Sequence, residues 1–364
     1  MQNLRIPGPT PCPDEVLQAM TKQMVNHRGP EFSQMLSKVT ENLKTLFQTK
    51  NDLFLLTGSG TGGLEAAVVN TLSPSDPVLA VSIGVFGDRF TSIAQQYGAE
   101  VVPLKVEWGR AVDPDDVRRA LDKEPRIKAV LITHNETSTG VTNDLASVSR
   151  VVREFDKLLL VDAISSLGSI DLPVDEWGCD VAVTGSQKGW MVPPGLAMVS
   201  VSEKAWQAHA EAKMPRFYWD FTRAKTYLGR GQTPWTPAVS IVYAMDTALE
   251  MMLEEGLANI VARHEHIGKM TRDGVKSLGL SLFADEDHAS NTVTAVNAPD
   301  GMNANDLRKT LLAEHDIVLG GGQQRLDGII FRIGHLGLVT EEDIQAVISA
   351  LRQALAKAGK AYAT

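Results

Sequence analysis

Short apolar runs alternate with amphipathic stretches through the first two thirds of the chain. Between several of the runs, apolar positions recur at helical spacing, as at 62–72, 88–98 and 144–156. Strands that are apolar nearly throughout and alternate with helices are typical of a mainly parallel sheet covered on both faces. The pattern therefore predicts a doubly wound α/β domain. Its expected strands, each bounded by turn-forming residues, are 51–57, 77–83, 99–106, 127–133, 157–163, 180–185 and 196–202.

The pattern changes near residue 237. Two long helices are expected there, at 237–256 and 257–278, and a strand, a helix, a glycine-rich loop (317–322), a strand and a final helix follow them. Four prolines by Pro13 predict that the first twenty residues form an extended arm that leads into a short helix. We therefore divide the chain into an N-terminal arm (1–20), a large domain (21–256) and a small C-terminal α+β domain (257–364).

Composition excludes several classes of function. The formal net charge is -9 and the chain has no basic run, which argues against a nucleic-acid partner. No signal peptide is recognisable and no apolar run approaches the roughly 18 residues that span a bilayer. Cys12 and Cys179 offer neither a disulfide framework nor zinc-ligand spacing, so we expect no metal, a buried structural thiol at Cys179 and a reducing cytoplasm.

A glycine-rich turn, TGSGTGGLEAA (57–67), follows an expected strand and opens an expected helix. Backbone N–H groups and the helix dipole converge at such a turn and can bind a phosphate. Gly58, Gly60 and Gly63 also match the dinucleotide fingerprint, but that fingerprint needs an acidic residue after the next strand, and PVLAVSIG has none. A strand–helix turn without any ligand is the other interpretation of this segment alone.

Two further residues stand at expected strand ends, where open α/β sheets place ligand-binding groups. Asp162 ends LLLVD, and a buried carboxylate needs strong donors or a cationic partner such as a protonated pyridine nitrogen. Lys188 lies between a strand and a Pro-Pro-Gly turn, where partial desolvation would free its amine for a Schiff base. Taken singly, the carboxylate could cap a turn and the lysine could be solvated. Their order after the phosphate turn favours one shared site.

Nine segments between Pro7 and Gly337 give the chain a family resemblance: PGPTPCPDEVLQAM, NHRGPEF, TGSGTGGLEAAVVN, GVFGDRF, THNETSTG, LLLVDAISSLG, GSQKGWMVPPG, TPWTPAVSIVYAM and FRIGHLG. With them the chain resembles the fold-type I pyridoxal-phosphate enzymes of the class V aminotransferase group, and within it the alanine–glyoxylate and serine–glyoxylate aminotransferases. The most specific segments are GSQK followed by PPG, and VDAISSLG. The resemblance implies a mainly parallel seven-stranded sheet, pyridoxal 5'-phosphate as cofactor, and a homodimer with shared active sites.

The resemblance also implies a role for each matching residue. Lys188 would hold the cofactor as a Schiff base and move a proton between substrate and cofactor, and Asp162 would keep the pyridine nitrogen protonated. Phe86 would stack on the ring, where some members have Trp. The remaining cofactor contacts would come from Ser59, Gly60, Thr61 and Gln187 at the phosphate and from Thr137 near the ring oxygen.

Other matching residues would bind the substrate or the partner subunit's cofactor. Arg332 would hold the substrate α-carboxylate with its guanidinium fork. Gln232 and Thr236 would reach the phosphate of the partner's cofactor. The residues Asn26, His27 and Arg28 are expected to line a site, and we interpret His27 and His134 as polar lining or structural residues, since Lys188 suffices as the proton carrier.

The implied reaction is a ping-pong transfer, through aldimine and ketimine stages, from alanine or serine to glyoxylate or another 2-oxo acid. No second cation is recognisable for a side-chain carboxylate, which disfavours aspartate and glutamate. Ureidoglycine and aminophosphonate transaminases are alternatives. So is a desulfurase-like lyase, although neither Cys12 nor Cys179 is placed as its nucleophile. A binding subunit without cofactor would be expected to lose Lys188, Asp162 or Arg332, and a hydrogenase subunit, a label some relatives have had, would need an iron–sulfur or nickel ligand set.

Overall fold

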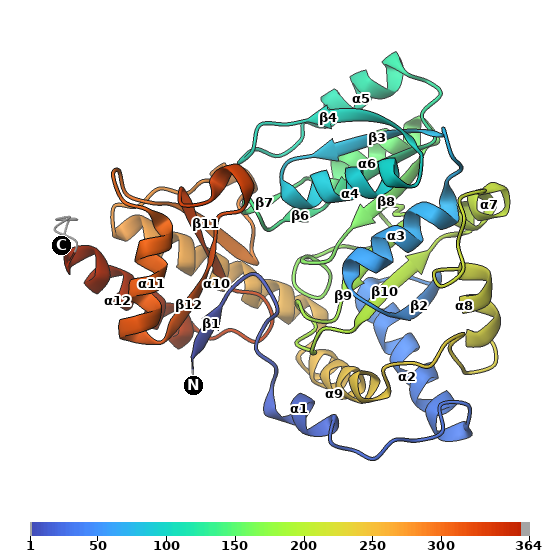
Figure 1. Cartoon of the computed structure of the whole chain (residues 1–364), viewed down its shortest axis with the longest axis horizontal. Coiled ribbons are helices and arrows are strands. Elements are labelled where there is room, and N and C mark those ends of the chain that lie inside the picture. The colour runs from blue at the N-terminus through green and yellow to red at the C-terminus, as the bar shows by residue number, and fades with distance from the viewer. Residues whose placement is uncertain (1, 358–364) are drawn as a thin grey trace.

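The computed structural model describes residues 2–357 and contains two principal sheets, a large one of seven strands and a small one of four (Figure 1). In the large sheet the strand order is β2-β10-β9-β8-β5-β3-β4. Strands β4, β3, β5, β8 and β9 run parallel, whereas β10 is antiparallel to both β9 and β2. The predicted mainly parallel seven-stranded sheet is confirmed. Its strands are β2 (Asp52–Thr57), β3 (Pro77–Ser82), β4 (Glu100–Lys105), β5 (Ala129–Thr133), β8 (Leu158–Asp162), β9 (Val181–Gly185) and β10 (Leu196–Val201).

Helices cover both faces of the large sheet because alternate strand residues point to opposite sides. On β8, for example, Leu159 and Val161 belong to one buried cluster, while Leu158 and Leu160 belong to the other. The first face is covered by α2 (Pro30–Phe47), α5 (Pro114–Lys123), α6 (Leu145–Glu154) and α9 (Val239–Glu255). The second is covered by α3 (Gly60–Thr71), α4 (Val85–Gln96), α7 (Glu203–Glu211) and α8 (Phe221–Leu228).

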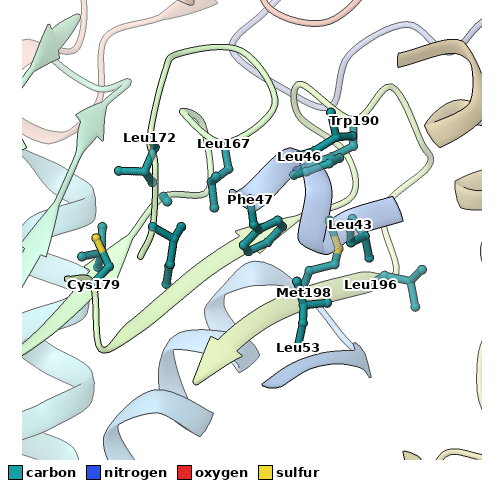
Figure 2. Packing of buried hydrophobic residues seen from close by; sticks show 14 of the residues in the cluster. Leu43, Leu46, Phe47, Leu53, Leu167, Leu172, Cys179, Trp190, Leu196 and Met198 are labelled. Carbon is teal, nitrogen blue, oxygen red and sulfur yellow. The ribbon is translucent and has the colours of Figure 1, made fainter. Parts of the chain in front are cut away.

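One part of the first cluster lies beneath the chain segment that carries Lys188. Trp190 is fully buried, stacks on Phe47 at a centroid separation of 5.6 Å, and donates its indole N–H to Thr184 Oγ1 at 3.0 Å. Figure 2 shows this packing, with Cys179 at the far end of the same cluster. Cys179 is buried as predicted, and burial raises the pKa of its thiol. The buried indole fixes the backbone two residues from Lys188.

The small sheet has the order β1-β12-β13-β11 and lies beside the large domain (Figure 1). Its first strand comes from the N-terminal arm, which leaves β1, forms the short α1 and then enters α2. The glycine-rich segment 317–322, expected as a loop, forms β12 because it pairs with both β1 and β13. The elements are β1 (Asn3–Arg5), α1 (Asp14–Ala19), α10 (Leu257–Ser277), β11 (Val293–Asn297), α11 (Ala304–His315), β12 (Ile317–Gly321), β13 (Ile330–Gly334) and α12 (Glu341–Lys357).

A two-stranded ribbon of β6 (Asn135–Glu136) and β7 (Val141–Thr142) follows β5. Gly140 at its tip has φ +75, and a Cβ there would lie 3.0 Å from Cβ of Ala295 in β11. The ribbon thus connects the carboxyl edge of the large sheet with the small sheet. Two short 3-10 turns, Glu286–His288 and Gln324–Leu326, complete the described elements. None of the helices in residues 2–357 combines the length and the apolar character needed to cross a bilayer.

Candidate active site

A cavity of about 120 Å³ opens at the carboxyl edge of the large sheet. It collects residues that follow β2, β3, β5, β8 and β9, because the carboxyl ends of parallel strands meet at one edge. Eight of the residues proposed from the sequence line it together: Ser59, Gly60, Thr61, Phe86, Thr137, Asp162, Gln187 and Lys188. Leu64, Arg89, Ile164 and Ser165 complete the lining.

Lys188 projects into this cavity from the turn after β9. Its amine donates a hydrogen bond to the carbonyl of Pro7 in the arm. The arm is tied to the same turn by Thr10, whose N–H donates to the Gln187 carbonyl at 3.1 Å and whose hydroxyl donates to the Lys188 carbonyl at 3.0 Å. Burial, with a smaller contribution from the positive charge of Arg332, lowers the pKa of Lys188 to about 8. A neutral, nucleophilic amine is therefore accessible near neutral pH.

Asp162 ends β8 on the floor of the cavity. One carboxylate oxygen accepts from the Ile164 N–H at 3.0 Å and the other from the Thr133 hydroxyl at 3.3 Å. Burial raises the pKa of Asp162 to about 7, and within residues 2–357 no cation forms an ion pair with it. A cationic donor placed in the cavity would relieve that desolvation and restore the charged form.

The N-terminus of α3 also lines the cavity. Ser59 is its N-cap residue in extended conformation, and the N–H groups of the first turn have no partners inside the helix. Glycine permits the close approach of helix and sheet, since a Cβ on Gly60 would lie 2.6 Å from Ile164 Cδ1. Beside this turn, the buried amide oxygen of Gln187 has no hydrogen-bond partner. The free N–H groups of the α3 N-terminus are arranged to bind an anion.

Arg89 lines the cavity although the sequence did not single it out. It follows Phe86 by three residues on α4, and its guanidinium lies 4.8 Å from the centroid of the Phe86 ring. Its Nη1 approaches the Thr61 hydroxyl at 3.5 Å. No carboxylate forms an ion pair with it in the described part of the chain. The i,i+3 spacing in GVFGDRF could have indicated that both side chains share one face.

Arg332 lies in β13 and approaches the site from the small sheet. Its Nε donates to the Gly321 carbonyl at 2.8 Å and its Nη1 to the Thr137 carbonyl at 2.9 Å. Burial lowers the pKa of Arg332 to about 10, and the negative charge of Glu136 acts in the opposite direction. Arg332 does not itself line the cavity, but it is one hydrogen bond away from Thr137, which does.

Other proposed residues lie away from the cavity of the single chain. Gln232 accepts a hydrogen bond from Arg28 at 3.1 Å, and Thr236 is exposed. His134 is buried with a pKa lowered by desolvation to about 4, and its ring meets Trp177 edge-on at 5.9 Å. These contacts make His134 a structural residue.

Neither cysteine lines the cavity, and Cys12 is half-buried in the arm. Among residues 2–357, no three His, Cys, Asp or Glu side chains come together in a way that could hold a metal ion.

The family Aminotransferase class-V matches residues 3–347 of the chain. The chain is 46% identical to the soluble hydrogenase small subunit of a Synechococcus species, over 98% of this chain and 93% of that protein. It is 40% identical to the L-aspartate–glyoxylate aminotransferase of Paracoccus denitrificans, over 97% of this chain and 91% of that protein. It is 38% identical to the serine–glyoxylate aminotransferase of Methylorubrum extorquens, over 97% and 90%.

Solved structures agree with these similarities. The ureidoglycine–glyoxylate aminotransferase of Bacillus subtilis superposes with a TM-score of 0.96 at 32% identity, covering 100% of this chain and 95% of that one. The alanine–glyoxylate aminotransferase of a Nostoc species gives 0.94 at 33% identity, covering 97% and 95%.

Proposed function

The chain belongs to the class-V aminotransferases, which use pyridoxal 5'-phosphate, and from this premise we propose that it transfers an amino group from alanine or serine to glyoxylate or another 2-oxo acid. The observation that supports this most is the convergence of Lys188, Asp162 and the α3 N-terminus on one cavity. An amine, a buried carboxylate and an anion cradle match the aldehyde, the ring nitrogen and the phosphate of that cofactor.

The residues present fit the cofactor chemically. Gln187 has a buried amide oxygen without a partner, and Asp162 is a buried carboxylate without a cation. Ser59, Gly60 and Thr61 stand at the helix N-terminus, where Cβ-free Gly60 lets the backbone approach. A phosphorylated pyridine would supply the cation that Asp162 lacks and an acceptor for the free N–H groups of the α3 N-terminus, and Gln187 would meet the phosphate through its amide NH2 group.

The chain's own residues then perform separate tasks. When bound, pyridoxal phosphate supplies an electron sink for the charge left on the substrate α-carbon. Lys188 would hold the cofactor, and its amine, once displaced by the substrate, would take the α-proton and deliver it to the cofactor carbon that had carried the aldehyde. Asp162 keeps the ring nitrogen protonated. Arg332 binds the substrate carboxylate bidentately and so orients the α-hydrogen toward Lys188.

The assignment of glyoxylate as acceptor and of a small donor has separate support. Three of the relatives and structures described above are named for glyoxylate as acceptor together with serine, alanine or ureidoglycine. The arm segment from Pro7 to Thr10 covers Lys188, which leaves little room beside the amine. A bulky donor side chain is disfavoured by that cover.

Aspartate is a second candidate donor. Arg89 supplies the additional cation in the cavity that the sequence did not reveal, and the relative from Paracoccus denitrificans is named for aspartate. A guanidinium without an acidic partner is suited to a second carboxylate.

One set of spectra tests the proposal. The purified protein is expected to show a visible cofactor band that is absent from Lys188→Ala. Alanine or serine should bleach the band, and glyoxylate should restore it. If aspartate bleaches the band faster than alanine or serine do, and if Arg89→Leu loses that advantage, aspartate is favoured as the donor. If no amino acid bleaches the band while glyoxylate is inert, the donor and acceptor assignments fail and only the cofactor assignment survives.

We also propose a homodimer in which Gln232 and Thr236 serve the partner's site. An aromatic group near them is partly exposed: Phe217 and Tyr218 both stack on Trp235, at 4.9 and 5.8 Å. Sedimentation should give twice the chain mass. Mixing inactive Lys188→Ala with a Thr236→Ala/Gln232→Ala variant should regenerate part of the activity, because one site of the hybrid dimer is then intact. Absence of any such recovery in a confirmed hybrid would refute the sharing.

A further inference from the structure

Glu136 is a fully buried carboxylate in β6, at 0% exposure. One carboxylate oxygen accepts from the N–H groups of Phe86 and Gly87, each at 3.0 Å. The other accepts from the Ser138 N–H at 3.1 Å and the Ser138 hydroxyl at 2.6 Å. No cation of residues 2–357 forms an ion pair with it. Burying an unpaired carboxylate is costly, so four donors around one side chain require an explanation.

The first explanation is the N-terminus of α4. Its N-cap residue, Gly84, has no side chain to satisfy the free N–H groups of the first turn. The β6 segment does so instead, because Ser138 Oγ accepts from the Val85 N–H at 3.0 Å while Glu136 accepts from the next two. A Cβ on Gly84 would lie 2.5 Å from Glu136 Cγ, so the glycine makes room for the carboxylate. Phe86, the ring-stacking residue, is therefore fixed at its backbone by Glu136.

The second explanation is Arg332. The residue after Glu136 is Thr137, and its carbonyl accepts the Arg332 Nη1–H at 2.9 Å. The negative charge of Glu136 also acts on the Arg332 guanidinium and stabilises its charged form. One buried side chain thus influences the group that would stack on the cofactor and the group that would bind the substrate carboxylate.

We propose that Glu136 is a positioning residue that fixes Phe86 against the cofactor ring and holds Arg332, through the 136–138 turn, above the substrate carboxylate, while its negative charge offsets part of the attraction between Arg332 and that carboxylate. The proposal rests on the proposed function, since it takes the roles of Phe86 and Arg332 from it. It adds a residue that touches neither ligand. It also explains why a carboxylate is buried here without an ion pair.

The geometry separates the two effects. In Glu136→Gln, the amide oxygen can face the Phe86 and Gly87 N–H groups while the amide nitrogen donates to the Ser138 hydroxyl, which already accepts from Val85. The Ser138 N–H and the Ser138 O–H then both lose the carboxylate oxygen that accepts from them in the parent. The glutamine variant keeps the helix cap and removes the charge, whereas Glu136→Ala removes both.

Two dissociation constants measure these effects. The first is for pyridoxal phosphate, titrated into apoprotein and followed by absorbance. The second is for propionate, a carboxylate without an amino group, from its competition against the amino donor. Asp180→Ala is the matched control, because Asp180 is another buried carboxylate that accepts from a backbone N–H (Leu159) and a hydroxyl (Ser202), remote from the cavity.

Glu136→Ala should weaken both pyridoxal phosphate and propionate by about tenfold or more, as expected when charge-assisted hydrogen bonds that position a binding group are lost. Glu136→Gln should restore pyridoxal phosphate binding to within about threefold of the parent. It should bind propionate about threefold more tightly, because a negative charge near Arg332 is gone. Asp180→Ala should lower the melting temperature and leave both constants within about twofold.

An alanine variant that only melts earlier, like Asp180→Ala, and binds both ligands as the parent does would overturn the proposal. If the alanine variant does not fold, the glutamine variant decides: tighter propionate binding supports the charge effect, and an unchanged constant refutes it. A parent protein that takes up no pyridoxal phosphate refutes the proposed function itself. If the parent takes up pyridoxal phosphate and Glu136→Ala binds both ligands as the parent does, only the proposal for Glu136 is refuted.

Discussion

Gly8→Ala tests whether the N-terminal arm positions Lys188. Gly8 has φ +117, and a Cβ added there would lie 2.5 Å from Lys188 Nζ, 2.7 Å from its Cδ and 2.8 Å from its Cε. Real Cβ atoms essentially never come that close to another heavy atom. The lysine is the flexible partner, so we expect its side chain to be displaced rather than the arm.

The energetic cost of Gly8→Ala has two separate contributions. An L-residue at this φ costs on the order of 1–3 kcal/mol in any surroundings. Moving Lys188 off its rotamer adds about 0.5–1.5 kcal/mol. The larger effect should be chemical, because a displacement of about 1 Å at a reacting group can reduce a rate by roughly 100-fold.

Gly301→Ala is the matched control. Gly301 also has positive φ (+75), but a Cβ there meets nothing within 4 Å. It should reproduce the backbone cost without touching Lys188. Thermal unfolding compares the stabilities, and borohydride reduction followed by peptide mass spectrometry measures how much cofactor is attached to Lys188.

We expect Gly8→Ala to lower the melting temperature somewhat more than Gly301→Ala, and attachment at Lys188 to be weakened by about tenfold or more only in Gly8→Ala. If Gly8→Ala attaches the cofactor and turns over like Gly301→Ala, the arm does not set the position of the amine, and the reasoning is wrong.

Three further changes have expected outcomes. Arg332→Lys keeps the charge but loses the fork, so the donor KM should rise about 10- to 100-fold in steady-state assays with little change in cofactor uptake. Asp162→Asn should still bind the cofactor, but bleaching by alanine in a single turnover should slow by about 100-fold, because a neutral amide cannot stabilise a protonated ring nitrogen. The buried histidines His134, His264 and His335 have pKa values lowered by desolvation to about 4, 4 and 3, from 6.5. Their neutral forms stabilise the fold fully above pH 6.5, and each should lose about 1.4 kcal/mol per pH unit as the pH falls toward 4, since only the unfolded chain takes up the proton there. A melting temperature that is flat between pH 7 and 5 would contradict this.

The large sheet was predictable because its strands are buried on both faces. A run such as 157–163 has no polar face to obscure it, and it matches β8 to within one residue at each end. The same reasoning placed Asp162 and the Lys188 turn at one edge, since strand ends in a parallel sheet meet there. Ser59 and Lys188 are far apart in sequence, yet both line one cavity.

What the sequence analysis missed depends on contacts between distant segments. β1 is three residues long, and only its pairing with β12 makes it a strand. Glu136 carries a charge that is ordinarily exposed, and its burial depends on a helix N-terminus some 50 residues earlier. The helical spacing between Arg89 and Phe86 could be read from the sequence, but the lack of an acidic partner for Arg89 could be seen only in the structure.

The small sheet contributes more to the site than one arginine. Arg332 in β13 pairs with Gly320 of β12, and Leu319, the next residue back along β12, pairs with Arg5 of β1. From Arg5 the arm runs directly to Pro7, whose carbonyl accepts from the Lys188 amine. The substrate is thus expected to be held at its carboxylate by one end of this strand set, and to lose its α-proton to a lysine that is held from the other end. Any shift of the small sheet relative to the large one would move Arg332 and the Pro7 carbonyl together. The register of β1, β12 and β13 therefore controls the distance between Arg332 and the Lys188 amine more directly than the cavity wall does.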